Sequence, residues 1–178
     1  DPDIFAMMLR NMFGAKLKLV SGYPGTNDGT LAMERGEVNG MCGISWSTAK
    51  ARHADWMKTG KVNLPVQFGL RKEADIGDVP AVIDLAKGEE QTRMIRLILA
   101  GQAMARPYAA PPGIPEDRHR ALIAAFDATM KDPEFLSDAD KLQADVSPVS
   151  AGEIERLLAD VYATPKDIIA KAAKAIVN

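Results

Sequence analysis

The loop Tyr23-Pro24-Gly25-Thr26-Asn27-Asp28 combines residue types that can hold a small anion. Thr26 and Asn27 carry hydrogen-bond donors, and Gly25 lets backbone N–H groups come close to a ligand. A helix that starts here would add the positive end of its dipole, which attracts negative charge. We therefore predict that Gly25, Thr26 and Asn27 bind a carboxylate and that Tyr23 forms a wall of the pocket.

The same loop has a plainer interpretation. Pro-Gly and Asn-Asp pairs are common in tight turns, and Asp28 is a suitable N-cap for the helix that follows. The loop lies between an apolar run at 16–21 and a helical segment that ends at Gly36. If the run is a strand, this position is a common place for ligand binding. Both interpretations stay open from the residues alone.

A second candidate, Ser45-Trp46-Ser47, follows the apolar run at 38–44. The tryptophan ring would give a ligand a flat apolar wall, and the two hydroxyl groups would give it donors. The alternative is a half-buried core tryptophan. We favour ligand binding by Ser45, Trp46 and Ser47, because the predicted strands at 16–21 and 38–44 would end at the same edge of a sheet.

Arg106 is the one charged residue in an otherwise apolar stretch at 103–108. A guanidinium pairs with a carboxylate through two parallel hydrogen bonds, so Arg106 is a further candidate ligand-binding residue. A surface position or a structural ion pair is an equally open interpretation.

Other kinds of chemistry have little support in the sequence. His53 and His119 stand alone, and the single cysteine, Cys42, lies in an apolar run, so we predict no metal site and no catalytic residue. The chain has no P-loop, no dinucleotide-binding fingerprint and no Gly-x-Ser-x-Gly motif, and we expect neither an enzyme nor a cofactor.

The charge balance bears on the partners of the chain. The 22 Lys and Arg residues are nearly matched by 24 Asp and Glu, which gives a net charge of -2. Because the basic residues are also scattered, nucleic acid and anionic membranes are not favoured as partners. No apolar run approaches the roughly 20 residues of a membrane span.

Strands are predicted near 16–21, 38–44 and 62–70, with helical segments between them. Strands that alternate with helices are typical of a mainly parallel α/β sheet, so the predicted fold class is α/β.

Helices are predicted where apolar residues recur at helical spacing between start and stop signals. Asp132 and Pro133 are expected to end one helix and to start the next. Ser150 and Glu153 form a predicted capping box. The main predicted helices cover residues 4–12, 89–100, 116–130, 153–162 and 165–176.

Short motifs follow one another in a fixed order along nearly the whole chain. After Tyr23 and Gly25 come Gly36-Glu37-Val38-Asn39, Asp78-Val79-Pro80, Ala110-Pro111-Pro112-Gly113-Ile114-Pro115 and Lys131-Asp132-Pro133-Glu134. In this order they resemble the Bug-type receptors, which are the extracytoplasmic solute receptors of tripartite tricarboxylate transporters.

The resemblance implies a periplasmic receptor that captures a small carboxylate-bearing metabolite and delivers it to the subunits of a membrane transporter. It implies a lobe like that of type II periplasmic binding proteins, with a mainly parallel sheet, in residues 1–101. Residues 102–178 would be a crossing segment with C-terminal helices that return to the other lobe.

Members of this family have a longer N-terminal part that begins with an export signal. The resemblance therefore implies a fragment without its signal peptide, and we expect such a fragment to self-associate, because it would expose an apolar edge and helix faces. Two other classes stay open, which are a ligand-sensing module for a signalling partner and a small α/β enzyme.

Overall fold

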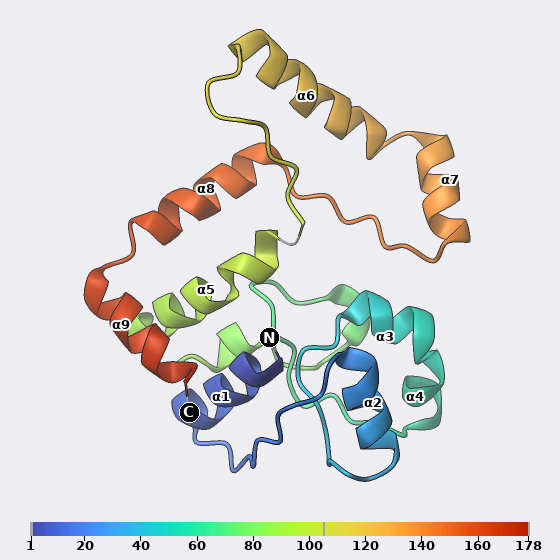
Figure 1. Ribbon diagram of the computed structural model, residues 1–178, viewed down its shortest axis with the longest axis vertical. Coiled ribbons are helices and arrows are strands. Elements are labelled where there is room, and N and C mark those ends of the chain that lie inside the picture. The colour runs from blue at the N-terminus through green and yellow to red at the C-terminus, as the bar shows by residue number, and fades with distance from the viewer. Residues whose placement is uncertain (1, 105, 178) are drawn as a thin grey trace. The chain divides into compact units, whose positions relative to one another are not determined.

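The computed structural model describes residues 2–104 and 106–177, and most of its elements are helices joined by loops (Figure 1). Helices make up 58% of the described residues and strands only 1%, so the fold is mainly helical. The α-helices are α1 (Pro2–Phe13), α2 (Thr26–Glu34), α3 (Trp46–Arg52), α4 (Ala54–Thr59), α5 (Glu89–Met104), α6 (Glu116–Thr129), α7 (Pro133–Lys141), α8 (Ala151–Tyr162) and α9 (Lys166–Ala175). Two short 3-10 helices are η1 (Ala74–Ile76) and η2 (Val82–Leu85).

The predicted α/β lobe with a mainly parallel sheet is wrong, because the described residues form no sheet. A strand needs a neighbour that takes up its backbone N–H and C=O groups. The run at 16–21 joins no ladder in the described part of the chain, and its Leu17 and Val20 are 42% and 48% exposed. The run at 38–44 is interrupted at Gly43, whose φ of 81° lies in the left-handed region.

The run at 62–70 comes nearest to the predicted strand. It makes one isolated parallel bridge, between Gln67 and Ala81. The side chain of Gln67 strengthens this contact, since its Nε2 donates to Val79 O at 2.8 Å and its Oε1 accepts from Glu73 N at 2.8 Å. With only 8% of Gln67 exposed, this buried amide holds the connection between α4 and η2 in place.

The helix signals predicted at Asp132-Pro133 and at Ser150 are confirmed. Asp132 caps α7 by accepting hydrogen bonds from the backbone N–H groups of Glu134 and Phe135, and Pro133 occupies the first turn. Ser150 and Glu153 form the predicted capping box at the start of α8. Local sequence therefore sets where these helices begin.

The chain divides into two compact units, one formed by residues 1–99 with 164–178 and the other by residues 100–163. The predicted division into a ligand-binding lobe at 1–101 and a helical return to another lobe at 102–178 stays a prediction.

The core of the first unit lies between α1 and the first part of α5. Its fully buried side chains are those of Met8, Val82, Ile95 and Leu99. Phe5 packs against this core and stacks on Phe68, with ring centroids 4.6 Å apart. Burying large apolar side chains of this kind contributes about 1.5–3 kcal/mol each to stability.

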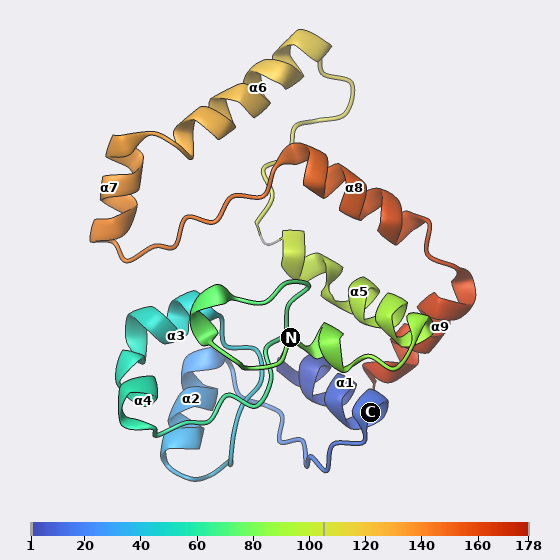
Figure 2. The same cartoon turned by 180° about the vertical axis from the view of Figure 1, so that it is seen from behind.

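Helix α9 completes the first unit by lying against α1, as Figure 2 shows from behind. Its Ile168, Ala172 and Ala175 are buried. The Asn11 Nδ2 atom donates to Ala175 O at 3.0 Å and to Val177 O at 2.9 Å. These bonds satisfy carbonyl groups that the end of a helix leaves without an intrahelical partner.

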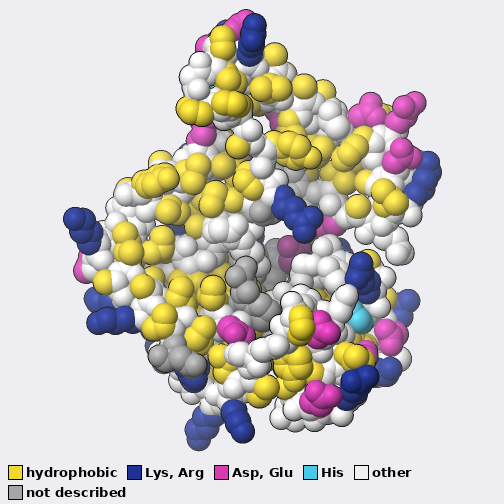
Figure 3. Space-filling view, in the orientation of Figure 1, with side chains coloured by type: hydrophobic (Ala, Val, Ile, Leu, Met, Phe, Trp, Pro, Cys, Tyr) yellow, Lys and Arg dark blue, Asp and Glu magenta, His cyan; other side chains and the backbone are white. Residues whose placement is uncertain are grey.

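The second unit contains the end of α5 and helices α6, α7 and α8, and it buries little apolar surface. Large apolar side chains on it remain exposed, including Leu122 at 57%, Leu142 at 79% and Tyr162 at 86%. Figure 3 shows hydrophobic side chains gathered over α6 and α8. Contiguous exposed apolar surface is typical of a surface that binds something.

Candidate functional site

The start of α2 is a helix N-terminus without a side-chain cap, and the prediction that it binds an anion stays a prediction. Gly25 is its N-cap, in an extended conformation, and no side chain makes a capping hydrogen bond there. The first N–H groups of a helix have no intrahelical acceptor. Thr26 and Asn27 are exposed at this turn, and Tyr23 is 37% exposed. The turn can therefore offer backbone and side-chain donors to an anion.

Asp28 is not the N-cap that the sequence predicted. It lies in the first turn of α2, one residue beyond Asn27. Its carboxylate stabilises the helix through the dipole, but it also places negative charge where an anion would bind. A Cβ atom built on Gly25 would lie 3.6 Å from Asp28 Oδ2, an ordinary van der Waals distance. Glycine at residue 25 is thus not a steric requirement.

Ser45 acts as a helix cap in the structure. Its Oγ accepts from Thr48 N at 3.3 Å and donates to Thr48 Oγ1 at 2.7 Å. The Ser47 Oγ lies 3.4 Å from the Ser45 Oγ. Because Ser45 already serves α3, Ser47 is the better placed of the two serines to serve a ligand.

The indole N–H, which is the only donor of the Trp46 side chain, makes a hydrogen bond within the protein. Its Nε1 donates to Asp75 Oδ1 at 2.6 Å, and Lys50 Nζ donates to Asp75 Oδ2 at 2.8 Å. The bond from Lys50, followed by that from Trp46, holds the pKa of Asp75 below its usual value. Lys50 Nζ also lies 5.9 Å from the centroid of the Trp46 ring. Trp46 can thus offer a ligand its ring but not its N–H group.

The two predicted stretches belong to the same unit. No hydrogen bond or ion pair joins residues 23–27 to residues 45–47 within the described ranges. Helix α2 is instead held by its other residues, since Trp56 Nε1 of α4 donates to Glu34 Oε1 at 3.2 Å. The predicted convergence on one sheet edge is wrong because the sheet itself is absent from the described residues.

Arg106 is exposed and belongs to the second unit. Its predicted contact with a ligand carboxylate stays a prediction.

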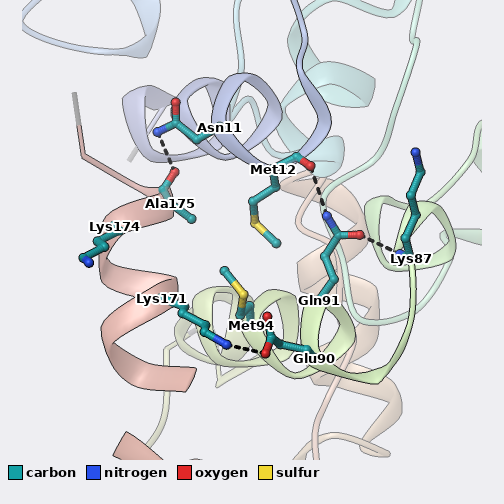
Figure 4. A pocket seen from close by; sticks show the side chains of 9 residues that line it. All are labelled: Asn11, Met12, Lys87, Glu90, Gln91, Met94, Lys171, Lys174 and Ala175. Carbon is teal, nitrogen blue, oxygen red and sulfur yellow. Dashed lines mark hydrogen bonds and ion pairs between the residues drawn. The ribbon is translucent and has the colours of Figure 1, made fainter. Parts of the chain in front are cut away.

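A depression that the sequence did not predict lies between α1, α5 and α9 and is widely open to solvent; we call it the cavity, and its volume is about 450 Å³ (Figure 4). Met12 from α1 and Met94 from α5 point toward each other across it. Gln91 forms one side, where its Nε2 donates to Met12 O at 3.0 Å and its Oε1 accepts from Lys87 N at 2.6 Å. The residues that line the cavity come from both ends of the chain. The only pattern in the sequence that relates them is the helical spacing of those within α5 and of those within α9.

Charged side chains surround this cavity. Lys171 of α9 pairs with Glu90 of α5, and Glu90 raises the pKa of Lys171 by accepting its hydrogen bond. The side chains of Lys87 and Lys174 lie on opposite sides of the two methionines and point away from the cavity (Figure 4). The described residues give neither of these two ammonium groups an ion-pair partner.

His53 and Cys42, which the sequence analysis considered for metal binding or catalysis, lie among packing residues of the first unit. His53 lies between α3 and α4 and stacks on Trp56, with ring centroids 3.9 Å apart. Cys42 is half-buried, and burial raises the pKa of its thiol. Within residues 2–104 and 106–177, no three His, Cys, Asp or Glu side chains are grouped so that they could hold a metal ion.

Comparison with known proteins gave no relative. No protein-family model matches the chain, and no curated protein or solved structure matches it significantly. In the described part of the chain, none of the helices has the length and apolar character needed to cross a membrane.

Proposed function

We propose that this chain belongs to an extracytoplasmic solute receptor that captures a small carboxylate-bearing metabolite. The receptor delivers this metabolite unchanged to the subunits of a tripartite tricarboxylate-type membrane transporter. The transport role rests on the order of the sequence motifs. The binding role rests mainly on one observation, which is the start of α2 at Gly25 without a side-chain cap.

The chemistry of this turn suits a carboxylate. Backbone N–H groups of a first helical turn, together with the hydroxyl of Thr26 and the amide of Asn27, are donors for carboxylate oxygens. A hydrogen bond to a charged group contributes about 1.5–3 kcal/mol, so a few such bonds give useful affinity. Tyr23 lies just before the turn and would cover the apolar part of the ligand.

The test is amide NMR during titration with small carboxylates. Citrate, succinate and benzoate are added in turn to the ¹⁵N-labelled full chain, and the backbone resonances of Thr26, Asn27 and Asp28 are followed. At least one of the three compounds is expected to shift these resonances in a saturable way. Saturable binding that leaves these three resonances unchanged, or the absence of binding by all three compounds, would contradict the proposal.

The variant Thr26→Val tests the side-chain contribution, because valine has nearly the same shape and lacks the hydroxyl. We expect it to weaken binding of the carboxylate that gave the shifts by roughly tenfold, since one charge-assisted bond is lost. Thr129→Val is the matched control. Thr129 ends α6 in the second unit, where its hydroxyl donates to Ala125 O.

A further inference from the structure

The cavity between α1, α5 and α9 has an apolar floor. Met12 and Met94 point into it from two helices, and both side chains are half-buried. Methionine side chains are flexible and polarizable, so they adapt to apolar ligands of different shapes. A volume of about 450 Å³ is also within the range of small-molecule sites.

Gln91 and Asn11, two polar residues that line the cavity, make hydrogen bonds within the protein. Gln91 bonds to Met12 O and to Lys87 N, and Asn11 bonds to Ala175 O. These groups therefore hold the three elements in place and do not need a ligand to complete their hydrogen bonds. The part of a ligand that lies between the methionines is expected to be apolar, because the side chains that face it there are thioethers.

The charges around the cavity are mostly positive. Lys87, Lys171 and Lys174 contribute three ammonium groups to the lining, and both carboxylates that oppose them act on Lys171: Glu90, which pairs with it, and the nearby Asp167. Lys87 and Lys174 have long, flexible stems and no ion-pair partner among the described residues, so they can turn toward a bound anion. The local field favours a negatively charged head group.

We propose that this cavity is a binding site for a medium-chain carboxylate, whose alkyl chain lies between Met12 and Met94 and whose carboxylate pairs with Lys87 or Lys174. The site is separate from the start of α2, so it stands or falls independently of the proposed solute site. It differs also in ligand class, because an alkyl chain is required for binding here and a small polar carboxylate is not sufficient.

Octanoate is the probe. The matched compounds are acetate, which lacks the alkyl chain, and octanol, which lacks the negative charge. In the full chain with ¹³C-labelled methionine methyl groups, octanoate is expected to shift the Met12 and Met94 methyl resonances and to leave that of Met57 in α4 unchanged. Octanoate should bind at least about tenfold more tightly than acetate or octanol, since each of these lacks one half of the interaction. Equal binding of octanol, or the absence of shifts at Met12 and Met94, would overturn the proposal.

Substitutions separate the two halves of the site. The double variant Lys87→Gln/Lys174→Gln should weaken octanoate binding about tenfold, because a charge-assisted pair is lost. Lys166→Gln, which removes an exposed lysine in the first turn of the same helix α9, should leave it unchanged. Met94→Gln should weaken octanoate binding while the circular dichroism spectrum stays that of the parent chain. Octanoate affinity that is the same in the parent, the double lysine variant and Met94→Gln would overturn the proposal.

Discussion

Single residues decide what the two predicted binding stretches can offer. Asp75 takes up the indole N–H of Trp46, and Ser45 is occupied with capping α3. At the other stretch, Asp28 brings a negative charge next to the uncapped turn at Gly25. A ligand would therefore meet the ring of Trp46, the hydroxyl of Ser47 and the donors of the α2 turn under the influence of the Asp28 carboxylate.

Replacing Asp28 by Asn is expected to raise the affinity for an anion at the start of α2. The substitution removes a like charge and keeps a side chain of the same shape, so affinity should rise about twofold to fivefold. Titration calorimetry with citrate measures the change. Asp117→Asn is the control, since Asp117 is an acidic residue in the first turn of α6 in the other unit. Lower affinity for citrate in Asp28→Asn would show that Asp28 helps to bind the ligand.

The hydrogen bond between Trp46 and Asp75 gives a pH-dependent signal. Because the folded-state pKa of Asp75 is lowered, the bond contributes to stability above the unfolded-state pKa and is lost as the pH falls through the lower, folded-state pKa. We expect the indole N–H resonance of Trp46 to titrate with a midpoint below the ordinary aspartate value of 3.8.

In the variant Asp75→Asn this titration of the Trp46 resonance should disappear. The indole N–H of Trp56, which donates to Glu34, should be unaffected by the substitution and serves as the control. A Trp46 midpoint at or above the ordinary aspartate value would contradict the geometry described.

At the scale of elements, local signals predict helices far better than they predict strands. A helix satisfies its backbone from within, so Asp132 and Ser150 can set the starts of α7 and α8 without help from distant residues. A strand needs a partner elsewhere in the chain, and the apolar runs at 16–21 and 38–44 do not contain that information. The helix starts at Asp132 and Ser150 were therefore predicted correctly from the sequence, and the sheet was predicted wrongly.

The two candidate sites differ in the same way, because local sequence indicates one of them and not the other. The donors at Gly25, Thr26 and Asn27 are neighbours in sequence, so a local pattern can indicate them. The cavity between α1, α5 and α9 brings Met12 to Met94 and to Lys171, and no local pattern predicts that these residues meet. The cavity arises only from the packing of these three helices.

Removing the cap of α8 should destabilise this helix selectively. In Ser150→Ala the backbone N–H of Glu153 loses its hydrogen bond to the Ser150 hydroxyl and keeps only the one to Ser150 O. Loss of an N-cap side chain typically costs about 1 kcal/mol. Hydrogen exchange of the amides in the first turns of α8 should become about fivefold faster. The control is Ser137→Ala, an exposed position inside α7, where alanine should leave exchange in α8 unchanged. Equal exchange rates in both variants would mean that the capping box does not hold the start of α8.

At the scale of the whole molecule, the second unit exposes apolar side chains that its own helices do not cover. We expect the chain to self-associate through them, with a mean mass in light scattering that rises with concentration. Leu122→Glu should reduce this association, because it places a charge on the exposed face of α6. Val20→Glu, at a similarly exposed position in the first unit, should not. A concentration-independent monomer mass for the parent chain would contradict this prediction.

The contact between α9 and α1 has a consequence for the order of folding on the ribosome. The bond from Asn11 to Ala175 spans 164 residues, so the first unit cannot be completed until residues 164–177 have been synthesised. The entropy cost of closing so long a loop grows only slowly with its length, by about 0.6 kcal/mol per doubling. Thermodynamics thus permits the arrangement, but translation delays it. During synthesis the surface of α1 that α9 will cover stays open, and the nascent chain is a potential client for a chaperone throughout that interval.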